Sequence, residues 1–157
     1  MIKIMRMKRK WLLMVLLLPL ATGLYCHRVM IYTPDIVLKK DGQPCISIPI
    51  QKFNFFNKNN RFDIIEADVF QVGIGTLWEK EYYDFSKKYS VNTGECLRFE
   101  YQFQRNRVYS ISFISAASGS KEFENGEQKI WSRDLRITTN TDGSAKLLLD
   151  LEARENN

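Results

Sequence analysis

Apolar and polar residues alternate along most of this chain, and this period of two predicts β-strands. The clearest example is Glu95–Phe103, where every second residue is leucine or aromatic and the residues between are polar. A longer β-branched stretch, Asp63–Trp78, contains Gly73 and Gly75, which indicate a bulge or a division into two strands. Similar alternation marks Asp35–Lys40, Pro44–Ile50, Val108–Ser115, Ile130–Thr139 and Ser144–Leu151.

These segments are short, each has one polar face, and turn signals separate them. Asp41-Gly42 and Asp142-Gly143 are typical of tight turns between strands. The pattern predicts an all-β fold, a single immunoglobulin-like antiparallel β-sandwich that follows an N-terminal signal segment. Glu95–Phe103 and Val108–Ser115 are expected to form a hairpin. Tyr109 then either bonds its hydroxyl to nearby backbone, as in a tyrosine corner, or is simply a core aromatic.

The first residues predict export. Five cations and no anion precede an apolar run of 14 residues from Trp11 to Leu24, shorter than the roughly 20 residues of a membrane-spanning helix. We therefore expect a signal peptide over residues 1–25, a tether over 26–34 and one β-sandwich domain over 35–157. The expected location is the periplasm, where disulfides form.

The basic balance of the chain does not indicate nucleic-acid binding. The sequence has 23 lysines and arginines against 18 acidic residues, but five of the cations lie in the leader. After removal of the leader, 18 basic residues face 18 acidic ones. A neutral domain offers no electrostatic footprint for phosphate, so no nucleic-acid partner is expected.

The three cysteines, at positions 26, 45 and 96, leave one thiol unpaired if two form a disulfide. Lipidation of Cys26 would explain the odd cysteine and anchor the protein, with the outer membrane as the expected destination because residue 27 is not aspartate. Cleavage after Gly23 is the alternative and would give a soluble periplasmic protein. Cys45 and Cys96 both fall at predicted strand starts, opposite the apolar series of their strands, and are expected to bond.

Catalytic residues are scarce in this sequence. The single histidine, His27, lies beside Cys26 in the tether, which argues against Ser-His or Cys-His chemistry. The cysteine spacing fits no zinc site, and no cofactor motif is present. Paired carboxylates are the remaining catalytic route, from Glu79, Glu81, Asp84, Glu122, Glu124 and Glu127. We expect a protein that is not an enzyme and has no metal or cofactor.

Aromatic loops are the candidate recognition elements. The segment Trp78–Tyr89 mixes aromatic side chains with charges of both signs, a composition suited to protein contact. The alternative is that these aromatics fold back as lids on the sandwich. Gln51–Phe62 is a second aromatic loop, and Lys121–Gln128 is an acidic loop able to steer a cationic partner. The predicted contact residues are Trp78, Tyr82, Tyr83, Phe85 and Tyr89.

Two segments carry a resemblance to a known family: DIVLKKDGQPCISIP from residue 35 and GECLRFEYQFQRNRVYSISF from residue 94. With Cys26 at the lipid position, they resemble small enterobacterial exported proteins described as type VI secretion immunity lipoproteins of the periplasm. Tyr25 departs from that pattern, since the family usually has a small residue before the lipidated cysteine. The resemblance implies a protein that binds and neutralises a toxic effector. The alternatives are a carbohydrate- or peptidoglycan-binding module that uses Trp78 and Trp131, or a structural envelope lipoprotein.

Overall fold

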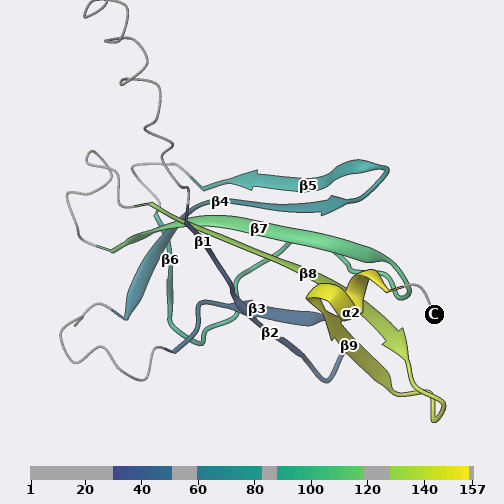
Figure 1. Cartoon of the computed structure of the whole chain (residues 1–157). Coiled ribbons are helices and arrows are strands. Elements are labelled where there is room, and N and C mark those ends of the chain that lie inside the picture. Colours follow the sequence, from purple (N-terminus) through teal and green to yellow (C-terminus); the bar gives the residue numbers. More distant parts are fainter. Residues whose placement is uncertain (1–29, 51–59, 83–87, 119–127, 156–157) are drawn as a thin grey trace, which may run out of the picture.

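The computed structural model describes residues 30–50, 60–82, 88–118 and 128–155. These residues form a mostly β structure with a seven-stranded mixed sheet, a two-stranded sheet and one short helix (Figure 1). The elements are β1 (Ile31–Tyr32), β2 (Asp35–Leu38), β3 (Pro44–Ser47), β4 (Arg61–Gln71), β5 (Gly75–Glu81), β6 (Tyr89–Asn92), β7 (Val108–Ala117), β8 (Lys129–Thr139), β9 (Ala145–Leu149) and α2 (Asp150–Arg154).

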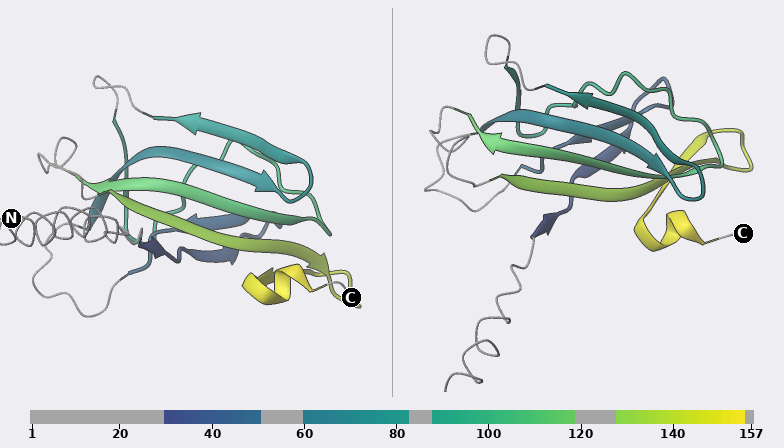
Figure 2. Two further views of the ribbon diagram at one scale, coloured as in Figure 1. Left: turned by 45° about the horizontal axis from the view of Figure 1, so that its top comes forward. Right: turned by 90° about the horizontal axis from the view of Figure 1, so that it is seen from above.

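The large sheet has the order β1-β8-β7-β4-β5, with β6 also paired to β4 and β9 also paired to β8. The β2–β3 pair lies in a second layer below this sheet (Figures 1 and 2). All pairs are antiparallel except β1 and β8, which are parallel. The prediction of an all-β fold is confirmed at this level, but a wholly antiparallel fold is wrong, because the chain enters the large sheet through β1 and changes layer at the buried Pro34.

The core lies between the two layers and is built by the period of two. On β7, Tyr109, Ile111 and Phe113 are at most 1% exposed, while the serines between them point to the other face. β3 contributes the buried Ile46 from the opposite layer. Burial of these side chains is the main stabilising term, at about 1.5–3 kcal/mol for each large one. Further core members are Ile36, Ile48, Ile64, Val69, Val91, Leu135 and Ile137.

The two glycines in the long β-branched segment divide it into two strands. β4 and β5 form a hairpin whose turn contains Gly73 at φ 82° and Gly75 at φ 112°. This left-handed region is readily adopted only by glycine. The predicted strands Asp35–Lys40, Pro44–Ile50, Val108–Ser115 and Ile130–Thr139 are also confirmed, within a few residues at their ends.

Glu95–Phe103, the clearest predicted strand, is not a strand and forms no hairpin with β7. Its burial still alternates, with Leu97 and Phe103 buried and Arg98 exposed, so the segment is extended as the pattern requires. It lacks a regular ladder because β7 pairs instead with β4 and β8. Alternation shows that successive side chains face two different environments. It does not predict which strand pairs with the segment.

The C-terminal prediction of a strand over Ser144–Leu151 is correct only as far as Leu149. Asp150 has a positive φ of 55°, and the five-residue helix α2 begins there. α2 packs on β8 and β9, where Ala153 is fully buried and Arg154 pairs with Asp134. A helix this short leaves no detectable 3.6-residue period in the sequence.

The predicted signal peptide of residues 1–25 lies outside the described residues, and so does most of the tether. The described end of the tether joins the large sheet, since Ile31 and Tyr32 pair with Ile130 and Trp131. Within the ranges that the structure describes, no helix is long and apolar enough to cross a membrane.

Candidate protein interface

Three of the five predicted contact residues lie within the described ranges, and all three pack against the core. The rings of Trp78 and Phe99 lie 5.4 Å apart, and those of Tyr82 and Tyr89 lie 4.7 Å apart. Trp78, Tyr82 and Tyr89 are each half-buried against the hydrophobic cluster. These three aromatic side chains therefore fold back over the core as lids, which was the alternative to a contact surface.

The hydroxyls of Tyr82 and Tyr89 are engaged inside the molecule. Tyr82 donates to the carbonyl oxygen of Arg98 at 2.9 Å, and the Arg98 N–H donates to the Tyr89 hydroxyl at 2.8 Å. Burial raises the pKa of Tyr82 to about 12, and it also raises the pKa of Tyr89. Both phenols therefore stay neutral under physiological conditions and serve to hold the 95–103 segment.

The remaining aromatic candidates are distributed differently. Tyr83 and Phe85 lie outside the described residues, as do residues 51–59 of the second aromatic loop and 121–127 of the acidic loop. Trp131 is only 2% exposed, and its indole N–H donates to the Ser115 hydroxyl at 2.9 Å. A buried, hydrogen-bonded indole is not placed to stack on a sugar ring.

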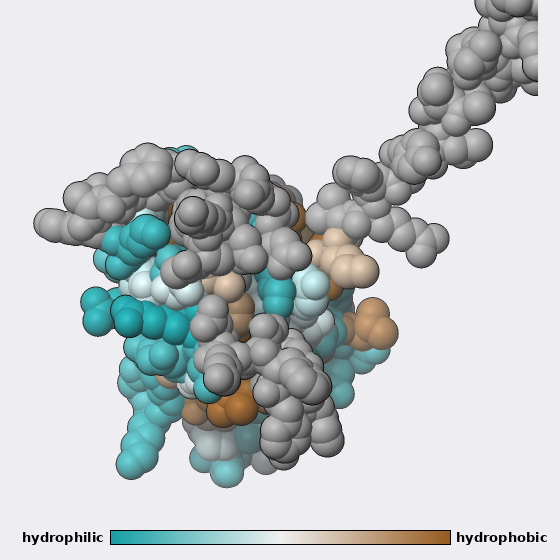
Figure 3. Space-filling view, turned by 90° about the vertical axis from the view of Figure 1, so that its left-hand side faces the viewer, coloured by the Kyte–Doolittle hydropathy of each residue, from teal (hydrophilic) through white to brown (hydrophobic). Residues whose placement is uncertain are grey.

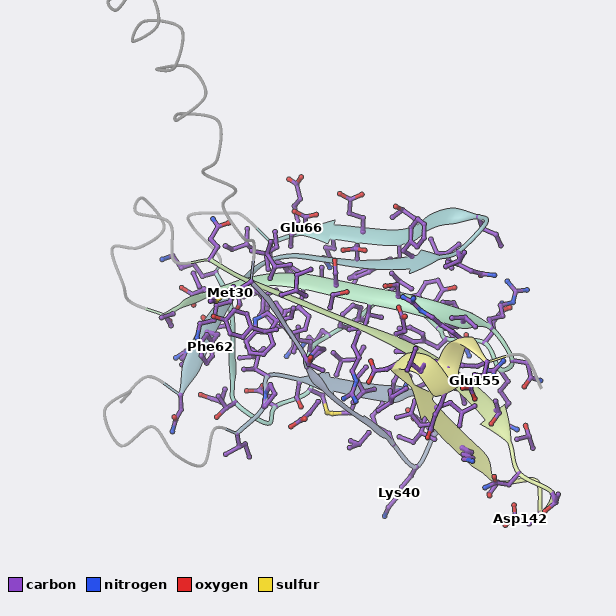
Figure 4. The ribbon with its side chains drawn as sticks, viewed as in Figure 1. Met30, Lys40, Phe62, Glu66, Asp142 and Glu155 are labelled. Carbon is purple, nitrogen blue, oxygen red and sulfur yellow. A yellow bond between two sulfur atoms is a disulfide. The ribbon has the colours of Figure 1, made fainter. Side chains whose placement is uncertain are left out.

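The outer face of the β4–β5 hairpin carries four carboxylates that sequence reasoning did not bring together. Glu66 pairs with Glu81 across the two strands, and Asp68 pairs with Glu79. In an antiparallel pair, opposed residues project to the same face, so all four lie on one surface. Figure 4 shows Glu66 on the side of this hairpin away from Lys40 and the β2–β3 layer. The signal was present, as Glu-x-Asp in one strand and Glu-x-Glu in the next.

This acidic face is not neutralised by its neighbours. Lys80, the one cation of β5, alternates to the opposite face, where it pairs with Glu100 at 2.5 Å. Among the described residues, none of the four carboxylates has a basic partner; Asp68 accepts a hydrogen bond from the Ser112 hydroxyl. Partial burial raises the pKa of Glu66, and the charges of Glu79, Asp68 and Glu81 raise it further. The face is therefore a concentrated patch of negative charge.

The tip of the same hairpin is apolar and exposed. Val72 and Ile74 in the turn are 70% and 63% exposed, and Phe70 beside them is 39% exposed. Where it is not covered in grey, the opposite end of the molecule shows both hydrophilic and hydrophobic areas (Figure 3), and Met30, Ile31 and Ile50 elsewhere in the chain are exposed to a similar degree. Large apolar side chains held in solvent on a hydrogen-bonded hairpin are typical of a surface that contacts another molecule.

The cysteine prediction is confirmed for one pair. Cys45 and Cys96 form a disulfide with their Cα atoms 5.0 Å apart, joining β3 to the extended segment after β6. This bond indicates an oxidising, extracytoplasmic compartment. Cys26 and His27 lie outside the described residues. The described ranges contain no cluster of three or more histidine, cysteine or acidic side chains arranged to hold a metal.

Two of the six carboxylates considered for catalysis lie within the described residues. Glu79 and Glu81 both lie on the acidic face described above, while Asp84, Glu122, Glu124 and Glu127 fall outside the described ranges. Both side chains are exposed, and exposed carboxylates that share one sheet face are suited to electrostatic contact with a charged partner.

Comparison with known proteins adds a family but no function. No curated protein and no solved structure matches the chain. One family profile matches residues 31–140, which begin at β1 and end just after β8, so that β9 and α2 follow the matched region. Because this match covers most of the chain, the protein belongs to the family described as Domain of unknown function (DUF7480).

Proposed function

We propose that this protein is an exported, immunity-type binding protein that neutralises a secreted toxic effector through protein–protein contact. The proposal follows the resemblance to periplasmic immunity lipoproteins of type VI secretion. The β4–β5 hairpin, with its apolar tip and acidic face, is the structural feature that supports it. Its rigid backbone keeps the entropy cost of presenting these side chains low.

The two parts of this hairpin have complementary roles in the proposal. Val72 and Ile74 are the anchors, because burial of exposed apolar side chains supplies most of the affinity at an interface centre. The carboxylates of Glu66, Asp68, Glu79 and Glu81 attract a partner of opposite charge and speed its association. The expected partner surface is therefore basic, with an apolar hollow for the hairpin tip.

The location belongs to the same proposal. The disulfide supports an extracytoplasmic site of action, and a lipid on Cys26 would anchor the protein, most simply to the outer membrane. Cleavage after Gly23 would instead release it into the soluble periplasm. In either case the binding domain meets a toxin after that toxin has crossed the outer membrane.

We further propose that the two layers are a divergent immunoglobulin-like β-sandwich. The chain changes layer at Pro34, and Tyr109 supports the assignment through its hydroxyl, which accepts a hydrogen bond from the Gln104 N–H at 3.0 Å. A tyrosine bonded to backbone upstream of it is a recurring feature of such sandwiches. Tyr109 is also fully buried, so its two expected roles coexist.

The test first asks whether a secreted toxin is encoded beside this gene, and then produces that toxin in cells that export the full-length protein. Val72→Ser with Ile74→Ser should weaken toxin binding by about tenfold or more and reduce protection, since hot-spot anchors contribute about 2 kcal/mol. Val37→Ser with Leu151→Ser is the matched control, because these residues are 58% and 75% exposed on other elements. A wild-type protein that neither binds the toxin nor protects would overturn the proposed function.

A further inference from the structure

β3 has one edge that faces β2 and one that faces away from it, and the hydrogen bonds between the two strands show which residues lie on each edge. Val37 pairs with Cys45 across β2 and β3, and the Lys39 N–H donates to the Gln43 carbonyl at 2.9 Å beyond them. Residues alternate in the side to which they present backbone groups. Position 44 and every second residue after it therefore present their backbone groups away from β2.

The extended segment after β6 lies along this edge, but it is hydrogen-bonded to β3 at one end only. The Ile48 carbonyl accepts from the Gly94 N–H, and the Ile46 carbonyl accepts from the Leu97 N–H, both at 2.8 Å. The next position on the edge is Pro44, which has no N–H to donate. The ladder stops there.

Beyond Pro44, the side chain of Gln43 supplies the hydrogen bonds to the segment. The Gln43 Oε1 accepts from the Phe103 N–H at 2.9 Å, and Gln43 Nε2 donates to the Phe103 carbonyl at 3.2 Å. The glutamine thus spans a gap between backbones too far apart to bond directly. Between the contact at Leu97 and this bridge lies a groove of about 490 Å³, lined by residues that include Pro44, Phe99 and Tyr101.

The alternation of the segment tells which backbone groups face this groove. Leu97 and Phe103 both bond toward β3, whereas Arg98 bonds to Tyr82 and Tyr89 on the other side. Phe99 and Tyr101 have the same parity as Leu97 and Phe103, so their N–H and C=O groups point into the groove. No backbone hydrogen bond of these two residues occurs within the described ranges.

We infer that this groove binds an extended peptide strand, a property beyond the proposed toxin neutralisation. A peptide backbone presents N–H and C=O groups at the spacing that Phe99 and Tyr101 require, and it can bond to the Pro44 carbonyl on the other wall. About three residues of strand cover this length at 3.3 Å each. Arg98 lines the groove together with Lys39, whose charge is already paired with Asp41 at 3.4 Å, so the Arg98 guanidinium favours a strand with an acidic side chain.

The first test uses a defined peptide on the full exported protein with its disulfide intact. The peptide is an acetylated tripeptide amide, Val-Asp-Thr, which matches the length of the groove, and its twin carries N-methyl groups on the aspartate and threonine amides. The unmethylated peptide should shift the ¹⁵N–¹H resonances of Phe99 and Tyr101. The twin should not, because its methyl groups remove the donors to the Phe99 and Tyr101 carbonyls and keep the strand too far from the wall for its own carbonyls to accept. Equal shifts with both peptides, or no shift at these amides with either, would overturn the inference.

The second test removes the cation that selects an acidic strand. Arg98→Gln should weaken binding of the aspartate peptide by about threefold or more, because the variant loses one charge beside the groove and keeps the backbone groups. Arg107→Gln is the matched control, since it removes an exposed cation outside the groove. Unchanged affinity in Arg98→Gln would argue against the site. Should that variant fail to fold, the N-methylated twin on the wild-type protein still decides.

Discussion

Tyr82 and Tyr89 pack ring against ring, and their hydroxyls hold the carbonyl and the N–H of the same residue, Arg98. The pair thus replaces the ladder that a neighbouring strand would have supplied to the 95–103 segment. Gln43 and Tyr109 do the same at Phe103 and Gln104. Side-chain hydrogen bonds, together with the disulfide at Cys96, fix this segment in the second layer.

The tyrosine pair should contribute measurably to stability. Tyr82→Phe or Tyr89→Phe keeps the ring packing but removes one hydrogen bond to Arg98, and each should lower the free energy of unfolding by about 1 kcal/mol. Urea denaturation measures the change. Tyr32→Phe is the control, because its hydroxyl has only a long contact of 3.9 Å to the Met30 sulfur. Equal effects in all three variants would contradict the assignment.

Removal of the disulfide should lower the free energy of unfolding by much more than either tyrosine variant does. Cys45→Ala with Cys96→Ala opens a link between residues 51 apart in sequence, and the chain-entropy account gives a loss of about 4 kcal/mol. The midpoint of chemical denaturation should fall accordingly, and reductant should lower the stability of the wild type but leave the double variant unchanged. A wild type insensitive to reductant would argue against the bond.

The acidic face should destabilise the isolated protein at neutral pH. The pKa of Glu66 is raised above its ordinary value of 4.5, so folding is favoured when this group is protonated and less favoured as the pH rises through the raised pKa. Glu66→Gln should therefore raise the free energy of unfolding at pH 7, by about 0.5 kcal/mol after allowance for solvent screening.

The gain from Glu66→Gln should shrink as the pH falls below 4.5, where Glu66 is protonated in both the folded and the unfolded state. Melting temperatures recorded between pH 3 and pH 7 measure this dependence. Glu152→Gln, on the exposed side of α2, is the control. A gain that does not vary with pH would show that charge is not its cause.

A side chain at Gly94 should destabilise the fold mainly through backbone strain. Gly94 has φ of 78°, so Gly94→Ala should lower the free energy of unfolding by about 1–2 kcal/mol. The added Cβ would lie 2.9 Å from the Ile50 Cδ1, but that atom ends a side chain that is 66% exposed and can rotate away. Gly143→Ala has a similar φ of 84° with open space around the Cβ, so thermal unfolding should show a similar loss for the two variants. A much larger loss in Gly94→Ala would contradict the assignment to strain.

The sequence by itself determined which residues are extended and which face of each is buried. Period-two alternation placed Ile46, Tyr109 and Ile111 in the core. This works because the tendency of a side chain to be buried depends on its own polarity, which is visible at each position of the sequence. The glycines of the β4–β5 turn and the parity of Cys45 and Cys96 were readable for the same reason, since positive φ and side-chain direction are local properties.

Tertiary structure alone decided which backbone lies beside which. Glu95–Phe103 has the alternation of a strand, yet it lacks a ladder because its neighbour on β3 reaches Pro44 and β7 is occupied by β4 and β8. The acidic face arose in the same way: Glu66 and Glu81 become neighbours only through the register of β4 and β5. Pairing is a long-range choice among many possible partners, and its free energy depends on contacts that no single segment contains.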